Sequence, residues 1–215
     1  MRTSKVILAG AVLALAGCDG GFELGGVTRK APEQILLSNG TVVAGAEGWC
    51  VDTATSRATA DTAVVVLGSC AAIAHSALAS RPDVPGVFTV SIDSDEGASP
   101  TPEDLAGFFS TDAGRAALAR NGNAESVEIL ETWAEDGLLY LRAADQSAAP
   151  GTDPEIWRAL FDMHGQFISV SLFGAADRPI GRDEGLATLE AQVDRLLSAN
   201  DADGTYPQES ALVLR

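Results

Sequence analysis

Side chains that catalyse reactions or bind metals are scarce in this chain of 215 residues. It has only two histidines, His75 and His164, and three cysteines, Cys18, Cys50 and Cys70. It contains neither the His-Glu-x-x-His pattern of zinc enzymes nor the Gly-x-Ser-x-Gly turn that presents a nucleophilic serine. By motif, the sequence therefore predicts no catalytic residue, no metal ligand and no cofactor.

Positive charge is also scarce. Lys and Arg number 14 against 30 Asp and Glu, which leaves a formal net charge of −16 at pH 7. Because so many carboxylates repel phosphate backbones, nucleic acids are excluded as partners. We interpret the acidity mainly as a source of solubility, with recruitment of a basic partner or a cation as the alternative.

The apolar run near the start of the sequence is too short for a transmembrane helix. Val6–Ala14 has nine residues, whereas crossing the hydrocarbon core takes about 20. The run follows the short, positively charged segment Met1–Lys5 and leads into Leu15-Ala16-Gly17-Cys18. A charged segment, an apolar segment and a small-residue site in this order are typical of an export signal.

Leu15-Ala16-Gly17-Cys18 resembles the lipobox of bacterial lipoproteins at all four positions. The resemblance implies that residues 1–17 are a lipoprotein signal peptide and that the thiol of Cys18 carries lipid, with acyl chains such as palmitate. It places the protein in the cell envelope, anchored to the inner or outer membrane and facing the periplasm. An ordinary cleaved leader with an incidental cysteine is the alternative. Residues 18–34 are rich in glycine and are predicted to form a flexible tether.

With Cys18 assigned to lipid, Cys50 and Cys70 are left as a pair. An even number of cysteines in an oxidising compartment predicts a disulfide. Closing a loop of 20 residues would stabilise the fold by roughly 3 kcal/mol in the chain-entropy model. A redox couple is the alternative, but exchange catalysts commonly use a Cys-x-x-Cys motif at a helix start.

Residues 35–215 are predicted to form a single α+β domain, an antiparallel sheet of hairpins with a helical insert and a C-terminal helix packed on one face. Asn39-Gly40 between apolar runs predicts a tight hairpin. Thr101 followed by Pro102 and Asp104 predicts a helix start, with a break or bend near residues 110–112 and an end at residues 121–122. Strands are expected over residues 48–52, 63–70, 87–92, 126–134, 138–143, 156–163, 167–173 and 211–214, and the C-terminal helix over residues 183–200.

The order of elements from Trp49 to Asn200 resembles the Mog1/PsbP-like layout that several bacterial lipoproteins share. Residues 48–52 and 68–70 also resemble segments of uncharacterised alphaproteobacterial envelope proteins. Neither resemblance implies an activity.

The sequence leaves three hypotheses about function. The first is a non-catalytic domain that binds a small ligand or an envelope protein partner. The second is a cryptic periplasmic hydrolase with His75 or His164 as its base, although a turn or surface position is the more usual role for each. The third is a calcium-stabilised domain, but the acidic segments 93–97 and 201–204 lack the spacing of an EF-hand.

Aromatic residues make up only 6% of the chain. Its three tryptophans, Trp49, Trp133 and Trp157, fall on predicted strands. A core position is the usual role for such residues, and a place in a ligand groove is the alternative.

Overall fold

A computed structural model describes residues 30–94, 99–201 and 212–213. Within these residues the chain has the predicted α+β fold, with a mostly antiparallel sheet and a C-terminal helix packed on it. The predicted signal peptide, Cys18 and the tether up to residue 29 lie outside the described residues. None of the helices that the structure describes has the length and apolar character needed to span a membrane.

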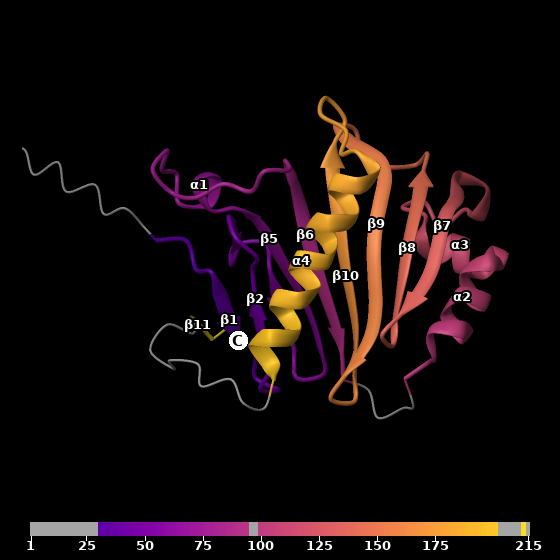
Figure 1. Cartoon of the computed structure of the whole chain (residues 1–215), viewed down its shortest axis with the longest axis horizontal. Helices are drawn as coiled ribbons and strands as arrows, with labels where there is room; N and C mark the ends of the chain where they lie inside the picture. The colour runs from indigo at the N-terminus through magenta and orange to yellow at the C-terminus, as the bar shows by residue number, and fades with distance from the viewer. Residues whose placement is uncertain (1–29, 95–98, 202–211, 214–215) are drawn as a thin grey trace, which may run out of the picture.

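The strands form two sheets (Figure 1). The larger has the order β3-β5-β6-β10-β9-β8-β7, with β4 also beside β5, and all of its pairs are antiparallel. In the smaller sheet β1 pairs antiparallel with β2 and parallel with β11. The strands are β1 (Gln34–Leu36), β2 (Val42–Ala44), β3 (Trp49–Val51), β4 (Arg57–Ala58), β5 (Thr62–Ser69), β6 (Gly86–Asp93), β7 (Val127–Glu135), β8 (Leu138–Asp145), β9 (Thr152–Met163), β10 (Gln166–Ala175) and β11 (Leu212–Val213).

The predicted hairpins are confirmed, and their turns explain why they form locally. Asp136 and Gly137 both have positive φ, as do His164 and Gly165, so β7–β8 and β9–β10 are each joined by a two-residue turn. Positive φ at both positions defines the turn type whose twist matches that of the strands. Gly40, which has positive φ, lies in the connection of residues 37–41 between β1 and β2.

The helical insert consists of two helices, α2 (Pro102–Ser110) and α3 (Asp112–Leu118). Thr101 and Asp104 form the predicted capping box, and Thr111 caps α3. A Cβ on Gly114 would lie 2.1 Å from the carbonyl oxygen of Phe108, so only glycine permits this close approach of α3 to the end of α2. The predicted end at residues 121–122 is wrong, because the helix stops at Leu118 and a short 3-10 turn, η1 (Ala124–Ser126), leads into β7.

The two faces of the larger sheet are covered by different elements. The helix α4 (Arg182–Asn200) and the β1–β2 hairpin cover one face, and α2 and α3 cover the other face at the end formed by β7 and β8 (Figure 1). Alternation along β8 shows this division. Leu138 and Tyr140 belong to the core under α4, whereas Leu139 and Leu141 belong to the core under α2 and α3.

Two amide side chains of α4 complete the free edge of β2. Gln192 Nε2 donates to the carbonyl of Ala44 (2.8 Å) and its Oε1 accepts from the amide of Ala46 (2.9 Å). Asn200 forms the same pair of hydrogen bonds with the amide and carbonyl of Val42 (2.9 and 2.8 Å). At a spacing of eight residues, Gln192 and Asn200 therefore replace a neighbouring strand.

Ion pairs connect the first turn of α4 to strands β7, β8 and β9. Arg182 pairs with Glu131 of β7, and Arg142 of β8 bonds both Glu131 (2.8 Å) and Glu155 of β9 (2.9 Å). The pKa of Glu131 is held below its usual value, mainly by the hydrogen bond from Arg182 and secondly by that from Arg142, although partial desolvation acts to raise it. The network joins β7, β8, β9 and α4.

Several predicted boundaries are corrected. The strand expected over residues 63–70 ends at Ser69, and Cys70 begins the short helix α1 (Cys70–Ile73). Strand β9 begins at Thr152 rather than at residue 156. Pro154 lies where the pairing of β9 with β10 shifts register, which is a position that tolerates a residue without a backbone N–H. The fold also includes Ala31, which is buried, although the predicted tether extended to residue 34.

Candidate ligand-binding site

On the side of the larger sheet opposite α4, helices α2 and α3 pack on β7 and β8. Phe167 of β10 packs against the same apolar core. Val64 and Val87 point to this side and are 44% and 42% exposed.

A cavity of about 420 Å³ opens on this side of the sheet. Its floor is formed by β6, β9 and β10, and its walls by the end of α3 and the connection from β8 to β9. We name it the Arg158 cavity, and its lining residues are Val87, Leu118, Arg120, Asp145, Ala148, Ala149, Thr152, Asp153, Ile156, Arg158 and Phe173.

Arg158 is the charged residue on the floor of this cavity. It lies on central strand β9 and is partly buried, and its Nε donates to Ser171 Oγ of neighbouring β10 at 2.8 Å. Ser171 is only 2% exposed, so this contact is protected from solvent. Burial lowers the pKa of Arg158 to about 10. The guanidinium is therefore desolvated but still positively charged at neutral pH.

The described part of the chain supplies Arg158 with no ion-pair partner. The two carboxylates in the cavity wall are engaged by backbone amides instead. Asp145 accepts hydrogen bonds from the amides of Arg120 and Ser147, each at 2.8 Å, and from the Ser147 hydroxyl. Asp153 accepts from the amide of Glu155 at 3.0 Å.

These hydrogen bonds keep Asp145 ionised. Burial by itself would raise the pKa of Asp145, but the hydrogen bonds from Ser147 and Arg120, together with the charge of Arg120, hold it below its usual value. Asp145 thereby fixes the loop that forms the cavity wall. The Arg158 cavity thus combines apolar surface, two carboxylates that accept hydrogen bonds, and two guanidinium groups, the exposed Arg120 and the partly buried Arg158.

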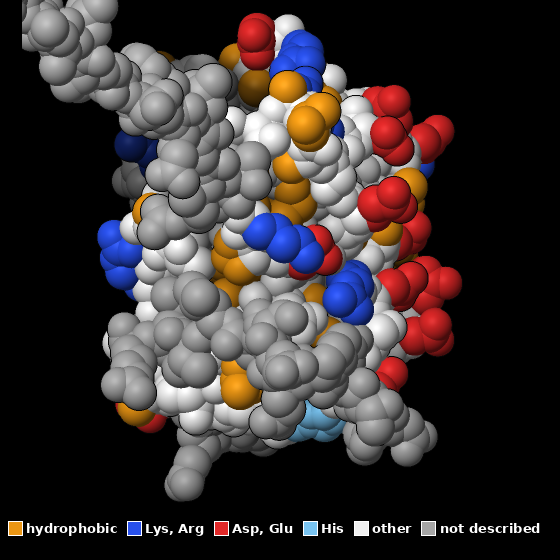
Figure 2. Space-filling view, turned by 90° about the vertical axis from the view of Figure 1, so that its left-hand side faces the viewer, with side chains coloured by type: hydrophobic (Ala, Val, Ile, Leu, Met, Phe, Trp, Pro, Cys, Tyr) orange, Lys and Arg blue, Asp and Glu red, His pale blue; other side chains and the backbone are white. Residues whose placement is uncertain are grey.

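The surface as a whole carries the opposite charge. Figure 2 shows Asp and Glu side chains gathered along one side of the face that it displays, whereas Lys and Arg are separated. On α4, Asp183, Glu184 and Asp194 are exposed. Arg158 lies on the sheet face opposite α4, away from these carboxylates.

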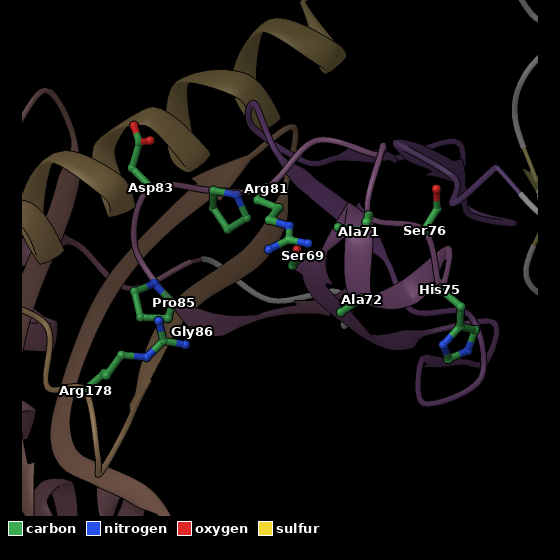
Figure 3. Close-up of a pocket in the computed structure, with 12 residues that line it drawn as sticks. Ser69, Ala71, Ala72, His75, Ser76, Arg81, Asp83, Pro85, Gly86 and Arg178 are labelled. Carbon is green, nitrogen blue, oxygen red and sulfur yellow. The ribbon is translucent and has the colours of Figure 1, made fainter.

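The two histidines do not form a catalytic pair with any described residue. His75 is exposed and lines a hollow of about 540 Å³ that also contains Ser76, Arg81 and Asp83. Figure 3 shows its ring lying apart from Arg81 and Asp83, and its side chain makes no hydrogen bond with the described residues. His164 is exposed in the β9–β10 turn. The hydrolase hypothesis therefore has no nucleophile–base pair in the described part of the chain.

The predicted disulfide between Cys50 and Cys70 is confirmed, with an S–S distance of 2.00 Å. It joins β3 to the first residue of α1 rather than strand to strand. Cys50 and Cys70 are 1% and 4% exposed, and they pack with Ala31 in a small cluster of their own. Because both residues are shielded from solvent, the bond has the setting of a structural disulfide rather than of an exchange catalyst.

The tryptophans lie outside the Arg158 cavity. Trp49 packs edge-on against Phe88 with ring centroids 4.7 Å apart, and Trp133 stacks on Tyr140 at 5.2 Å. Trp157 is 1% exposed and lies under α4. Their predicted core role holds for Trp49 and Trp157, while Trp133 is partly buried.

Sequence reasoning missed Arg158. The available signal was a single arginine between apolar residues of a predicted strand, but alternation alone does not show whether such a side chain faces solvent or a cavity.

Neither a family model nor a curated protein sequence matches this chain.

Proposed function

We propose that this protein is a membrane-anchored envelope lipoprotein whose folded domain binds a small ligand in the Arg158 cavity without chemical conversion. The observation that carries the binding role is the partly buried Arg158 at the floor of the cavity, which forms no ion pair with any described residue. A desolvated charge is costly to a fold unless something compensates it, and a bound anion would do so.

The polar groups in the cavity favour binding over catalysis. Arg158 is held by Ser171, and Asp145 and Asp153 accept hydrogen bonds from backbone amides. Both carboxylates accept hydrogen bonds that shape the wall, and the described lining of the cavity contains no histidine, cysteine or serine that could act with them as a base–nucleophile pair.

The lipid anchor rests on the resemblance of Leu15-Ala16-Gly17-Cys18 to a lipobox. Twelve residues separate Cys18 from Ala31, where the described fold is already packed. A segment of that length spans at most about 40 Å when fully extended. The proposed anchor would therefore hold the binding domain close to the membrane surface. The likeness to Mog1/PsbP-like domains remains a prediction about layout and adds no ligand.

An envelope protein partner is the second candidate. The observation that favours it is the exposure of Val64 and Val87 on the sheet face opposite α4, where Val87 also lines the cavity. A protein that covered this face would exclude water from both valines.

The binding role is tested by purifying the protein from native membranes and recording its mass under native conditions. We expect a small molecule to remain bound to the wild type and to be lost from Ala149→Trp, which fills the cavity from its wall. Ala77→Trp, in the hollow lined by His75, is the matched control and should retain the ligand. A ligand that Ala149→Trp retains, or a wild type with neither a bound molecule nor a partner, would refute the binding role.

The anchor is tested by metabolic labelling with palmitate. We expect label on the wild type and none on Cys18→Ser. Equal labelling of both proteins, or no labelling of the wild type, would contradict the lipoprotein assignment.

A further inference from the structure

The chemistry of the Arg158 cavity narrows its ligand to one class, an inference that rests on the proposed function. We infer that the ligand is a small amphiphile with a single carboxylate on an apolar body, the carboxylate binding Arg158 and the apolar body lying against Val87, Ile156 and Phe173.

Arg158 has hydrogen-bond donors that no described residue uses. A guanidinium has five N–H donors in a planar fork. Within the described residues only its Nε–H is used, by Ser171. The N–H groups of both Nη atoms remain available. Paired donors of this shape match the two oxygens of a carboxylate or a phosphate, so an anion is the ligand group that satisfies them best.

Apolar side chains line much of the cavity. Ile156 and Leu118 are buried, Phe173 is partly buried and Val87 is 42% exposed, and all four line the same cavity. An inorganic ion would use Arg158 and leave this apolar surface in water. An apolar body would cover this surface and remove it from water, which favours binding. A volume of about 420 Å³ suits a small organic molecule.

The carboxylates in the cavity wall favour a ligand with a single negative charge. Asp145 and Asp153 lie in the cavity wall, and the pKa of Asp145 is held low, so this side chain is negative at neutral pH. A phosphate monoester with two negative charges would be repelled by these carboxylates, and of the two arginines in the lining only Arg158 is desolvated, because Arg120 is exposed. A singly charged carboxylate balances Arg158 without that repulsion.

Ser171 has a positioning role in this arrangement. Its hydroxyl is buried and holds the Nε edge of Arg158, which leaves the Nη edge as the one that can face a ligand. Removing the hydroxyl would release the guanidinium to other orientations without removing its charge. We therefore expect Ser171→Ala to weaken binding less than a loss of the charge does.

The test uses the Cys18→Ser protein in solution and four probes at concentrations below micelle formation: octanoate, 1-octanol, octylamine and acetate. Affinities are measured by calorimetry. We expect octanoate to bind at least tenfold more tightly than each of the other three, because it alone has both the anionic group and the apolar chain.

Arg158→Gln should weaken octanoate binding roughly 10- to 100-fold, the range for loss of a charge-assisted contact. The same variant should bind 1-octanol as the parent protein does, which shows that the cavity is still folded. Arg178→Gln removes an exposed arginine of the hollow lined by His75 and should leave octanoate binding unchanged.

The inference is overturned if octylamine or 1-octanol binds as tightly as octanoate, if acetate does so, or if Arg158→Gln keeps the parent affinity for octanoate. These results differ from failure of the proposed function. If a native ligand is still lost from Ala149→Trp while octanoate does not bind, the cavity binds ligands but the assigned class is wrong.

Discussion

Replacing Gln192 by leucine should destabilise the fold far more than the loss of one polar side chain on a helix usually does. Gln192 is fully buried and provides both a donor and an acceptor to the edge of β2. Leucine has nearly the same size but leaves the Ala44 carbonyl and the Ala46 amide without partners. Each unsatisfied buried group costs about 1–3 kcal/mol.

After allowance for the greater hydrophobicity of leucine, we expect Gln192→Leu to lower the free energy of unfolding by about 2–4 kcal/mol. In a chain of this size each kcal/mol shifts the melting temperature by about 2–4 °C, which predicts a fall of roughly 5–15 °C. Urea unfolding of the disulfide-intact protein, followed by tryptophan fluorescence, measures the free energy. Gln146→Leu, at an exposed loop position, is the control and should change it by less than about 0.5 kcal/mol.

Gln192→Glu makes the same prediction sharper. A protonated glutamic acid can donate to Ala44 and accept from Ala46 as the amide does, whereas the carboxylate has no proton to donate and would be buried with a charge. Burial should therefore raise the pKa of Glu at this position. The variant should be closest to wild type below about pH 4 and lose stability as the pH rises. A Gln192→Leu protein within 0.5 kcal/mol of wild type, or a Glu variant that gains stability as the pH rises, would refute the reasoning.

Three further predictions concern other contacts of the fold. Gly185→Ala should destabilise the protein by about 1–3 kcal/mol in urea unfolding, since its Cβ would lie 2.3 Å from the Trp157 ring. Because the pKa of Asp145 is lowered in the fold, its ionised form should stabilise the protein above about pH 4, and this effect should disappear as the pH falls below that value. In urea unfolding, the free energy of Asp145→Asn should therefore change less between pH 7 and pH 3 than that of wild type. Reduction of the Cys50–Cys70 bond should lower the free energy of unfolding by roughly 3 kcal/mol, measured by urea unfolding with and without dithiothreitol.

Each of these predictions has a control in the same chain. Gly107→Ala has no atom within 4 Å of the added Cβ and should be neutral or stabilising, so an equal loss at both glycines would contradict the packing argument. Exposed Asp177→Asn should keep the acid sensitivity of wild type. Cys18→Ser should respond to dithiothreitol as wild type does. Loss of the response in that variant would show that the stabilising bond involves Cys18.

The sequence predicted those parts of the fold whose cause is local. Asp136-Gly137 and His164-Gly165 adopt their turns because each pair tolerates positive φ, and the capping box at Thr101 needs only residues within one helical turn. The Cys50–Cys70 pair followed from the number of cysteines and the expected compartment, but the prediction that the bond joins two strands was wrong, because Cys70 begins α1. Boundaries were less accurate where pairing between strands extends an element, as at the start of β9.

The tertiary structure alone decided which face of the sheet each helix covers, and the candidate site depends on that choice. Alternation in β9 places Arg158 opposite Trp157, but only the packing of α4 on one face and of α2 and α3 on part of the other leaves Arg158 beside a cavity. Gln192 likewise sits within an apolar stripe whose period predicts a helix and says nothing of the strand edge that it completes. Periodicity reports the conformation of a segment. The partner that a side chain meets is set by contacts between residues far apart in the chain.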